Sequence, residues 1–286
     1  MTINDLSTTE QTWVLSGFAD EIDPDPVVQF AVLQALGSRH VEVRGAWDTN
    51  VLDFSDDQLT RLQSLISTHG MTVSSIASPV GKVDVSAAPD DEVVRLATAI
   101  RVAHRLGTRY IRMFSFFRRD GLAAAEIRDG VLVRMRALAD LAERENVILL
   151  HENEKGIYGD TPERCLDLIE SVGSDALRVA WDSANFVQVG VKPFTEGYAM
   201  LRPHLEYFQV KDAIAVTGDV VPAGEGDGQL LETLTALRDD GYSGFMSLEP
   251  HLGVTNSYGG FSGAESFGRA ARAFRDLTTQ IGIVTV

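Results

Sequence analysis

The chain has 286 residues, of which 44% are hydrophobic and 23% are charged, as in ordinary globular proteins. Its 25 Lys and Arg stand against 41 Asp and Glu, and the net charge of −16 disfavours a nucleic acid or an anionic membrane as partner, because both are bound through basic surfaces. The lone Cys165 excludes an intramolecular disulfide, and no apolar run has the roughly 18 to 20 residues of a membrane span, so we expect a cytoplasmic protein.

The first stretch, residues 1–12, is polar and lacks the basic and apolar segments of a signal peptide, so we expect a flexible leader there. From residue 13 onward, apolar stretches alternate with amphipathic ones. The expected strands are residues 13–19, 40–44, 71–77, 109–114, 147–154, 177–182, 205–211 and 244–249. The expected helices are residues 26–36, 55–69, 90–106, 124–145, 162–172, 194–201, 229–240 and 264–280.

The ends of these helices have the usual signals. Pro162 falls at a first helical position, where the missing N–H costs nothing. Ser55 is an N-cap candidate, and the two aspartates after it complement the helix dipole. Gly37 and Gly70 each follow a helix directly before a strand. The boundaries between helices and strands are therefore well marked.

Eight strand–helix units follow one another without a strong domain break, at an average spacing of about 36 residues. This pattern predicts an α/β protein with a single closed (β/α)8 TIM barrel and a parallel eight-stranded core over residues 13–286, in preference to an open doubly wound sheet. No Gly-x-Gly-x-x-Gly motif follows the first strand, so the fingerprint of a dinucleotide site is absent.

Three of the expected strands end in a carboxylate. The apolar run at 147–150 leads to Glu152, and two later strands end at Asp182 and Glu249; Gln209 lies near the end of the strand between these two. Successive members of this set are 30, 27 and 40 residues apart, about one strand–helix unit each, so they can come from adjacent strand ends. The bland alternative is that these acids cap helices or pair with arginines at the rim.

Carboxylates gathered in one pocket repel one another unless a cation lies among them. Oxygen donors without a thiolate favour a hard or borderline divalent ion, so the sequence predicts a site for an ion such as Mn²⁺ or Mg²⁺. The expected metal ligands are Glu152, Asp182, Gln209 and Glu249.

Several stretches resemble the xylose-isomerase-like TIM-barrel superfamily of sugar-phosphate isomerases and epimerases, and the resemblance covers nearly the whole chain. They are Val-Glu-Val-Arg-Gly at 41–45, His-Glu-Asn-Glu-Lys at 151–155, Trp-Asp-Ser-Ala-Asn at 181–185, Gln-Val-Lys-Asp-Ala at 209–213, Gly-Glu-Gly-Asp-Gly at 224–228 and Ser-Leu-Glu at 247–249. The resemblance implies a metal-dependent barrel with a Glu, Asp, His, Glu ligand set, in which Glu152, Asp182 and Glu249 take three places.

The chain departs from this pattern at two positions. Gln209 stands where many members have histidine, and an amide oxygen is a poorer donor to Zn²⁺ than imidazole, so either Mn²⁺ or Mg²⁺ is expected in preference to Zn²⁺, or the site is weak. Asn185 stands where epimerases of free ketoses often place a histidine; it can bind a hydroxyl but cannot shuttle a proton.

The resemblance implies proton abstraction next to a carbonyl through an enediolate, with Glu152 and Glu249 as the catalytic carboxylates on opposite faces of a sugar or polyol substrate. The same ion could instead support a dehydratase of an inositol-like or keto-sugar substrate, and a barrel that only binds carbohydrate is a third reading. The related apurinic endonucleases need a histidine-rich site and a DNA-binding face, which six histidines and a charge of −16 disfavour.

Other polar residues near the expected mouth are candidates for binding substrate. They are Arg44, Lys82, Asn185, Lys211 and His251. The alternative for Arg44 is a salt bridge at the rim, and the alternative for Lys82 is that it is simply solvated.

Lys211 and Asp212 are expected to pair beside the ion. Strand alternation places His151 on the face opposite Glu152, so we expect it to be a structural residue. We also expect a lid at 253–263 and consider a homo-oligomer. A small anionic substrate stays compatible with the acidic composition, because local charge decides its binding.

Overall fold

The computed structural model of the chain describes residues 11–119, 121–253 and 260–286, so the expected leader at 1–12 and the middle of the expected lid at 253–263 fall largely outside the described residues. Eight parallel strands form the core. They are β1 (Thr12–Gly17), β2 (His40–Val43), β5 (Thr72–Ala77), β6 (Tyr110–Met113), β7 (Ile148–Glu152), β8 (Leu177–Asp182), β9 (Leu205–Val210) and β12 (Phe245–Leu248).

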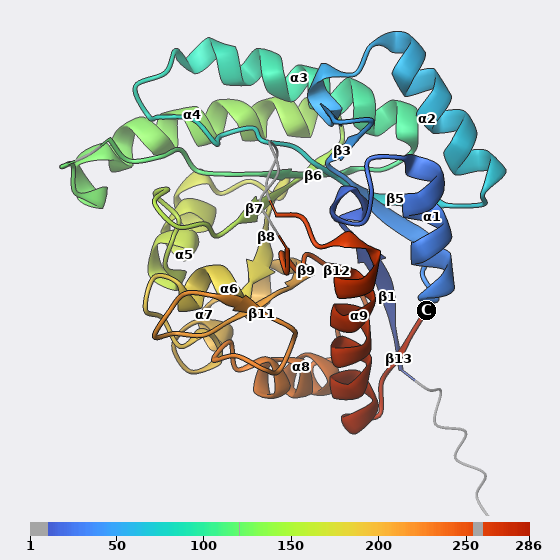
Figure 1. The fold of residues 1–286 in the computed structure, drawn as a ribbon. Coiled ribbons are helices and arrows are strands. Elements are labelled where there is room, and N and C mark those ends of the chain that lie inside the picture. The colour runs from blue at the N-terminus through green and yellow to red at the C-terminus, as the bar shows by residue number, and fades with distance from the viewer. Residues whose placement is uncertain (1–10, 120, 254–259) are drawn as a thin grey trace, which may run out of the picture.

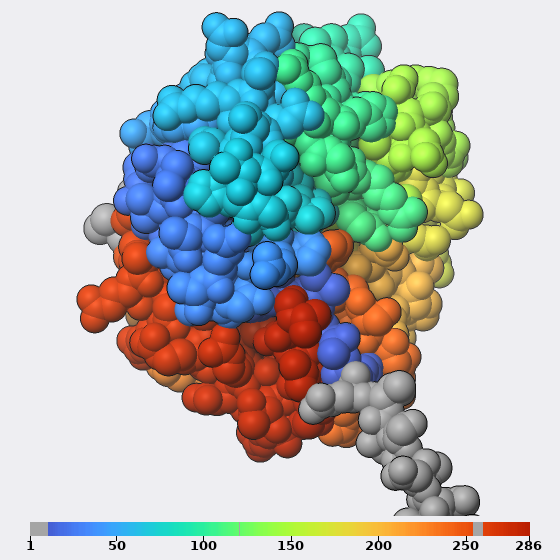
Figure 2. Space-filling view, turned by 90° about the vertical axis from the view of Figure 1, so that its right-hand side faces the viewer, coloured from blue at the N-terminus to red at the C-terminus, as the bar shows by residue number. Residues whose placement is uncertain are grey.

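The sheet order is β13-β1-β12-β9-β8-β7-β6-β5-β2, and a parallel bridge between Phe18 and Glu42 joins its first and last barrel strands. The predicted (β/α)8 barrel is therefore confirmed. A ninth strand, β13 (Val284–Thr285), pairs with the start of β1, so the red C-terminal segment contacts the blue N-terminal segment (Figure 2). This short pairing was not expected from the sequence.

Helices surround the strands (Figure 1). The long ones are α1 (Pro26–Ala35), α2 (Asp56–Thr68), α3 (Pro89–Leu106), α4 (Ala124–Arg144), α5 (Pro162–Val172), α8 (Leu230–Asp239) and α9 (Gly263–Gln280), each within a few residues of its prediction. The expected helix at 194–201 is a π-helical turn, Pro193–Tyr198, continued by α7 (Ala199–Leu201). Within the described parts of the chain, none of the helices is both long and apolar enough to span a membrane.

Several short elements lie at the carboxyl ends of the strands. They are the 3-10 turn η1 (Ala19–Glu21), the hairpins β3 (Gly45–Ala46) with β4 (Thr49–Asn50) and β10 (Asp212–Ala213) with β11 (Val220–Val221), and α6 (Ser183–Val187). All of them lack the length that gives a periodic pattern, and none was predicted as an element. They build the walls of the barrel mouth.

The barrel interior changes from apolar to polar along its axis. Near the amino ends of the strands, Leu150, Ala180 and Tyr207 pack together with partly buried neighbours. Above them the Tyr207 hydroxyl donates to Glu42 Oε2 at 2.9 Å and bonds Ser74 at 2.9 Å. The polar part of the interior thus lies at the carboxyl ends, where (β/α)8 barrels place their sites.

Candidate metal and active site

Three carboxylates converge at the mouth of the barrel. Glu152 ends β7, Asp182 ends β8 and Glu249 follows β12 directly. One oxygen of each lies within 4.8 Å of the other two, and all three side chains are buried. Oxygens that share one Mg²⁺ at about 2.1 Å lie at most about 4.2 Å apart. Small side-chain movements would therefore let the three oxygens share an ion.

Two buried side-chain cations lie between these carboxylates. Lys211 Nζ is 2.6 Å from Asp182 Oδ2 and 3.1 Å from Glu249 Oε2. Arg112 Nη1 is 3.0 Å from Glu152 Oε2 and 3.6 Å from Glu249 Oε1. From the sequence we expect a metal ion alone to offset the repulsion among the three carboxylates. The side chains of Lys211 and Arg112 already offset part of this repulsion.

Gln209 lies beside Asp182 in the β8–β9 register and is fully buried. Neither atom of its amide group has a hydrogen-bond partner among the described residues. A buried amide without a partner costs free energy, which a bound cation at its oxygen would offset. This orphaned amide and the three carboxylates form a donor set that fits a hard divalent ion.

Burial affects the pKa values of the three carboxylates unequally. Burial raises the pKa of Asp182 to about 7, against the opposing charge of Lys211, and burial also raises the pKa of Glu152, against Arg112. For Glu249 burial acts in the same direction, but Lys211, His251 and Arg112 outweigh it and lower its pKa well below the usual range. Glu152 and Glu249 therefore have environments that push their pKa values apart.

A histidine joins Glu249 to a second buried acid. His251 Nε2 is 3.3 Å from Glu249 Oε1 and 3.2 Å from Glu21 Oε1, and Glu21 is completely buried in η1. The backbone N–H of His251 donates to Glu21 Oε2 at 2.8 Å, and His251 has a φ of 47°, in the left-handed region that non-glycine residues rarely adopt. His251 lies beside Glu249 as predicted, whereas Glu21 was not among the candidates.

Arg44 is held in a buried salt bridge. Its Nε donates to Asp20 Oδ2 at 2.7 Å and its Nη2 to the Gly260 carbonyl at 2.9 Å, while Nη1 lies 3.4 Å from Glu249 Oε1. Arg44 therefore faces the pocket, but most of its donors are used by the protein.

Asn185 and Lys82 lie at different heights in the mouth. Asn185 Nδ2 donates to Glu152 Oε1 at 3.0 Å, so it orients that carboxylate. Lys82 Nζ donates to Glu154 Oε2 at 2.9 Å, and its side chain is 40% exposed at the rim. Asn185 is thus close to the carboxylates, and Lys82 lies above them.

The prediction that Lys211 and Asp212 form a pair is wrong. Neighbouring residues of an extended chain point in opposite directions, so Lys211 enters the pocket and Asp212 faces away from it. The Asp212 carboxylate instead accepts from the backbone N–H groups of Gly224, Gly226 and Gly228 at 2.9, 3.1 and 2.8 Å. The same alternation turns His151 away from the pocket.

His151 is fully buried, and its Nε2 lies 2.9 Å from Ser115 Oγ. Burial lowers the pKa of His151 to about 3, so it is neutral near pH 7. This agrees with the structural role expected from the sequence.

Arg112, Asp20 and Glu21 are the polar residues of the pocket that the sequence did not single out. Arg112 lies within an apolar strand at alternate spacing from Tyr110 and Phe114, which was a signal that it faces the interior. Asp20 and Glu21 lie in a turn without periodicity, so only the folded chain identifies the side on which they lie.

The molecule is thus a (β/α)8 barrel whose mouth contains a cluster of buried carboxylates that could bind a metal ion. Residues 30–277 match the family model described as xylose isomerase-like TIM barrel, and the chain belongs to this family. The resemblance predicted from the sequence is confirmed.

Two proteins of known name are similar to this chain. The 2-epi-5-epi-valiolone 7-phosphate 2-epimerase of an Actinoplanes species is 31% identical over 143 residues, which cover 50% of this chain and 51% of that protein. A probable L-ribulose-5-phosphate 3-epimerase of Mycoplasma pneumoniae is 23% identical over 192 residues, covering 65% and 62%. The matches span only about half to three fifths of these relatives, and both names denote epimerases.

Among solved structures, a xylose isomerase-like TIM barrel protein from Mycobacterium smegmatis in complex with magnesium has the same fold. Its TM-score is 0.71 at 18% identity, and the match covers 94% of this chain and 98% of that one.

Proposed function

We propose that this protein is a divalent-metal-dependent isomerase or epimerase of a sugar or polyol, acting by removal of a proton next to a carbonyl group. The observation that supports it best is the convergence of Glu152, Asp182 and Glu249, three buried carboxylates with one oxygen each within 4.8 Å of the other two. They lie beside the amide of Gln209, which has no hydrogen-bond partner among the residues that the structure describes. The names of the two relatives agree with this class.

In this proposal Glu152, Asp182, Gln209 and Glu249 hold Mn²⁺ or Mg²⁺. The bound ion supplies Lewis-acid polarisation of the substrate carbonyl, which makes the neighbouring C–H more acidic. The amide of Gln209 in place of imidazole is the reason for preferring these ions to Zn²⁺.

The proton is moved by the chain's own carboxylates. One of Glu152 and Glu249 removes it from one face of the substrate, and the other returns a proton on the opposite face, which gives the epimer. Arg112 Nη1 lies 3.0 Å from Glu152 Oε2 and 3.6 Å from Glu249 Oε1, so its charge offsets their mutual repulsion, and Asn185 orients Glu152. Lys211 and His251 can donate hydrogen bonds to substrate oxygens close to Glu249, and Arg44 helps to fix Glu249.

Deuterium exchange tests this proposal. The protein, loaded with Mn²⁺ or Mg²⁺, is incubated in D₂O with a panel of ketoses, ketose phosphates and keto-polyols. Label at the carbon next to the carbonyl, with the mass otherwise conserved, is the expected result. Loss of water would instead identify the dehydratase alternative, and the absence of both reactions with every ion and substrate would favour the barrel that only binds carbohydrate.

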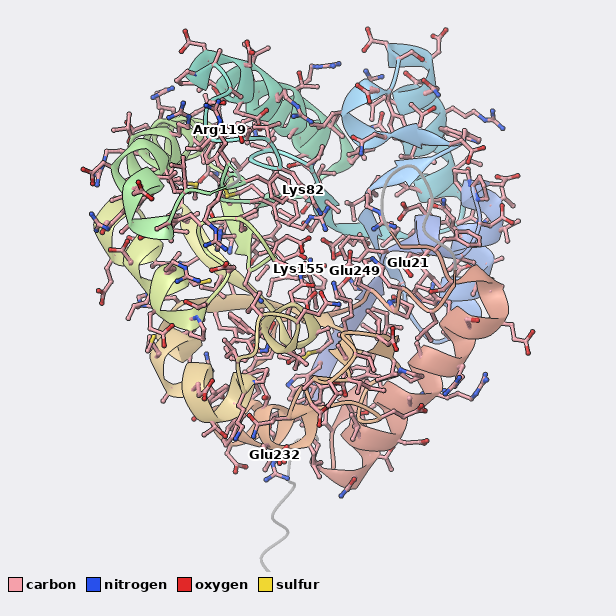
Figure 3. All side chains as sticks on the ribbon, turned by 60° about the vertical axis from the view of Figure 1, so that its left-hand side comes forward. Glu21, Lys82, Arg119, Lys155, Glu232 and Glu249 are labelled. Carbon is pink, nitrogen blue, oxygen red and sulfur yellow. The ribbon has the colours of Figure 1, made fainter. Side chains whose placement is uncertain are left out.

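Two substitutions test the assigned residues. Glu152→Gln and Glu249→Gln are each expected to lower kcat by at least about 100-fold, since positioned proton transfer contributes roughly that much. Glu232→Gln is the matched control, because Glu232 is exposed on α8 and lies far from Glu249 (Figure 3). Near-normal turnover in either active-site variant would refute its role.

We also propose that residues 13–286 form one catalytic domain. A cytoplasmic location and a homo-oligomer stay predictions.

A further inference from the structure

Four basic residues that are exposed or partly exposed lie on three neighbouring loops at the rim of the barrel mouth. These rim loops, residues 78–88, 114–119 and 153–160, follow β5, β6 and β7 and contain Lys82, Arg118, Arg119 and Lys155. The segments that follow β1, β9 and β12, at 18–25, 212–229 and 249–262, contain no Lys or Arg. They hold nine Asp or Glu residues, four in each of the first two segments and one in the last. The rim loops hold three acids, Asp84, Glu154 and Asp160, against four basic residues, so in a chain with a net charge of −16 this side of the mouth has a small excess of positive charge.

Main-chain hydrogen bonds tie the rim loops into one framework. Phe117 bridges Asp84 on one side and Ile157 on the other, and its N–H and carbonyl bond Val83 and Val85 at 2.8 and 3.0 Å. The second of these loops is joined to the third where the Arg118 N–H donates to the Gly156 carbonyl at 3.0 Å. Basic side chains on this framework have fixed origins.

The ring of Phe114 lies next to both Lys82 and the arginine that contacts the carboxylates. Lys82 Nζ is 4.6 Å from the centre of the Phe114 ring, and the Arg112 guanidinium is 4.9 Å from the same centre. Arg112 in turn bonds Glu152 at 3.0 Å. A substrate whose reacting carbon lies at Glu152 and whose charged end group is several bonds away would therefore bring that group to Lys82.

The two lysines have donors to spare. An ammonium group has three N–H donors, and Lys82 makes one ion pair, with Glu154, while its side chain is 40% exposed. Lys155 is exposed and makes no ion pair with any of the described residues. In Figure 3 both lysines lie near Glu249 in the middle of the view, and Arg119 lies farther out.

We propose that Lys82 and Lys155 form a phosphate subsite, and that the natural substrate is a sugar or polyol phosphate whose phosphate lies remote from the reacting carbon. This inference rests on the proposed function. A phosphate monoester has a charge near −2 at pH 7, which two ammonium groups offset, and its oxygens accept charge-assisted hydrogen bonds. Glu154, held by Lys82 Nζ and the Lys155 N–H, orients the first lysine.

Rates with a matched substrate pair test the subsite. A ketopentose and its 5-phosphate are compared by deuterium exchange in D₂O, and kcat/KM is expected to be at least about 100-fold higher for the ester. Lys82→Met and Lys155→Met should each lower this ratio by about 10- to 100-fold, chiefly through KM, and Lys82→Arg should restore most of it. Lys192→Met, an exposed lysine elsewhere on the rim, is the control and should leave the ratio unchanged.

Binding of inorganic phosphate provides a readout that does not depend on turnover. Calorimetric titration of the metal-free protein should detect phosphate, and both methionine variants should bind it at least about 10-fold more weakly. Equal exchange of the sugar and its ester would overturn the subsite and leave the proposed function intact. If neither the sugar nor its ester exchanges deuterium, the proposed function is refuted. The phosphate titration then tests the subsite by itself, and equal phosphate binding by the wild type and both variants would overturn the subsite.

Discussion

Gln209 is the residue whose chemistry bears most directly on the choice of ion. It lies on β9 next to Asp182, completely buried, and its amide atoms have no partner in the part of the chain that the structure describes. Most buried polar groups are hydrogen-bonded, so an exception is informative. A water or a cation is the natural partner for this amide, and the carboxylates around it favour the cation.

Replacing this amide by imidazole is expected to strengthen zinc binding. Gln209→His adds a nitrogen donor to three carboxylates, and nitrogen suits Zn²⁺ better than an amide oxygen does, so we expect Zn²⁺ affinity to rise at least about 10-fold. Competition against a chromophoric chelator measures it.

The control is Gln63→His, which places a histidine on the exposed face of α2. An affinity that rises equally in both variants, or in neither, would mean that Gln209 does not reach the ion.

At the scale of an element, the loop after β9 is organised by one carboxylate. Asp212 is buried and accepts four backbone hydrogen bonds, from Ala213, Gly224, Gly226 and Gly228. A Cβ on Gly226 or Gly228 would come within 2.5 or 2.6 Å of Asp212 Oδ1, so the glycines are required for this close approach. The loop folds around Asp212, and Lys211 is fixed on the opposite side of the chain.

Removing that carboxylate should destabilise the protein. In Asp212→Ala the four N–H groups lose a charged acceptor, and we expect the free energy of unfolding to fall by about 2–4 kcal/mol. Denaturant unfolding measures it. Asp219→Ala, in the same loop but exposed, is the control and should cost less than about 0.5 kcal/mol. A loss as small for Asp212→Ala would show that the loop does not need its carboxylate.

The elements themselves could be predicted because their signals are local. Apolar strands with glycine or proline at their borders, such as the run that ends at Glu152, follow from periodicity alone. Strand ends also predicted the convergence of Glu152, Asp182 and Glu249, because parallel strands of a barrel share one edge. What the sequence could not predict are contacts made across the mouth, such as that between Glu21 and His251, which are 230 residues apart. The direction of Asp212 could have been predicted from the alternation that placed His151 correctly.

For the whole molecule, the buried acid Glu42 links stability to pH. Burial raises the pKa of Glu42 to about 7 from its usual 4.5, against the opposing charge of Arg112. Between these two values the folded protein holds a proton that the unfolded chain has released. The contribution of this proton to the free energy of unfolding is therefore complete below pH 4.5 and is lost as pH rises through 7. Between these values the free energy of unfolding falls by up to about 1.4 kcal/mol per pH unit.

Glu42→Gln should remove this dependence. Glutamine cannot ionise, so the stability of the variant relative to wild type should increase from pH 4 to pH 8 by about 2–3 kcal/mol. Urea unfolding of both proteins over this pH range measures the difference. A difference that stays constant with pH, or decreases, would contradict the raised pKa. Glu232→Gln, on the surface of α8, is the control for the loss of one acid.

An ion in the pocket would connect half of the barrel. Its four proposed donors come from β7, β8, β9 and the residue after β12, which are adjacent in the sheet. The unfolded chain does not hold these donors together, so the ion binds the folded protein preferentially and stabilises it. Because Lys211 and Arg112 already offset part of the negative charge, the metal-free protein should still fold.

We therefore expect Mn²⁺ to raise Tm without being required for folding. At 100 times the Kd the gain is about 2.7 kcal/mol, which for a chain of this size corresponds to a shift of about 5–10 °C in a thermal unfolding experiment. Asp182→Asn weakens a proposed ligand and should reduce the shift to less than half, whatever its own Tm in the absence of metal. Glu232→Gln removes one exposed acid and should keep the full shift. An equal shift in wild type and Asp182→Asn would place the ion elsewhere on this acidic protein, and no shift in wild type would mean that the pocket relies on Lys211 and Arg112 alone.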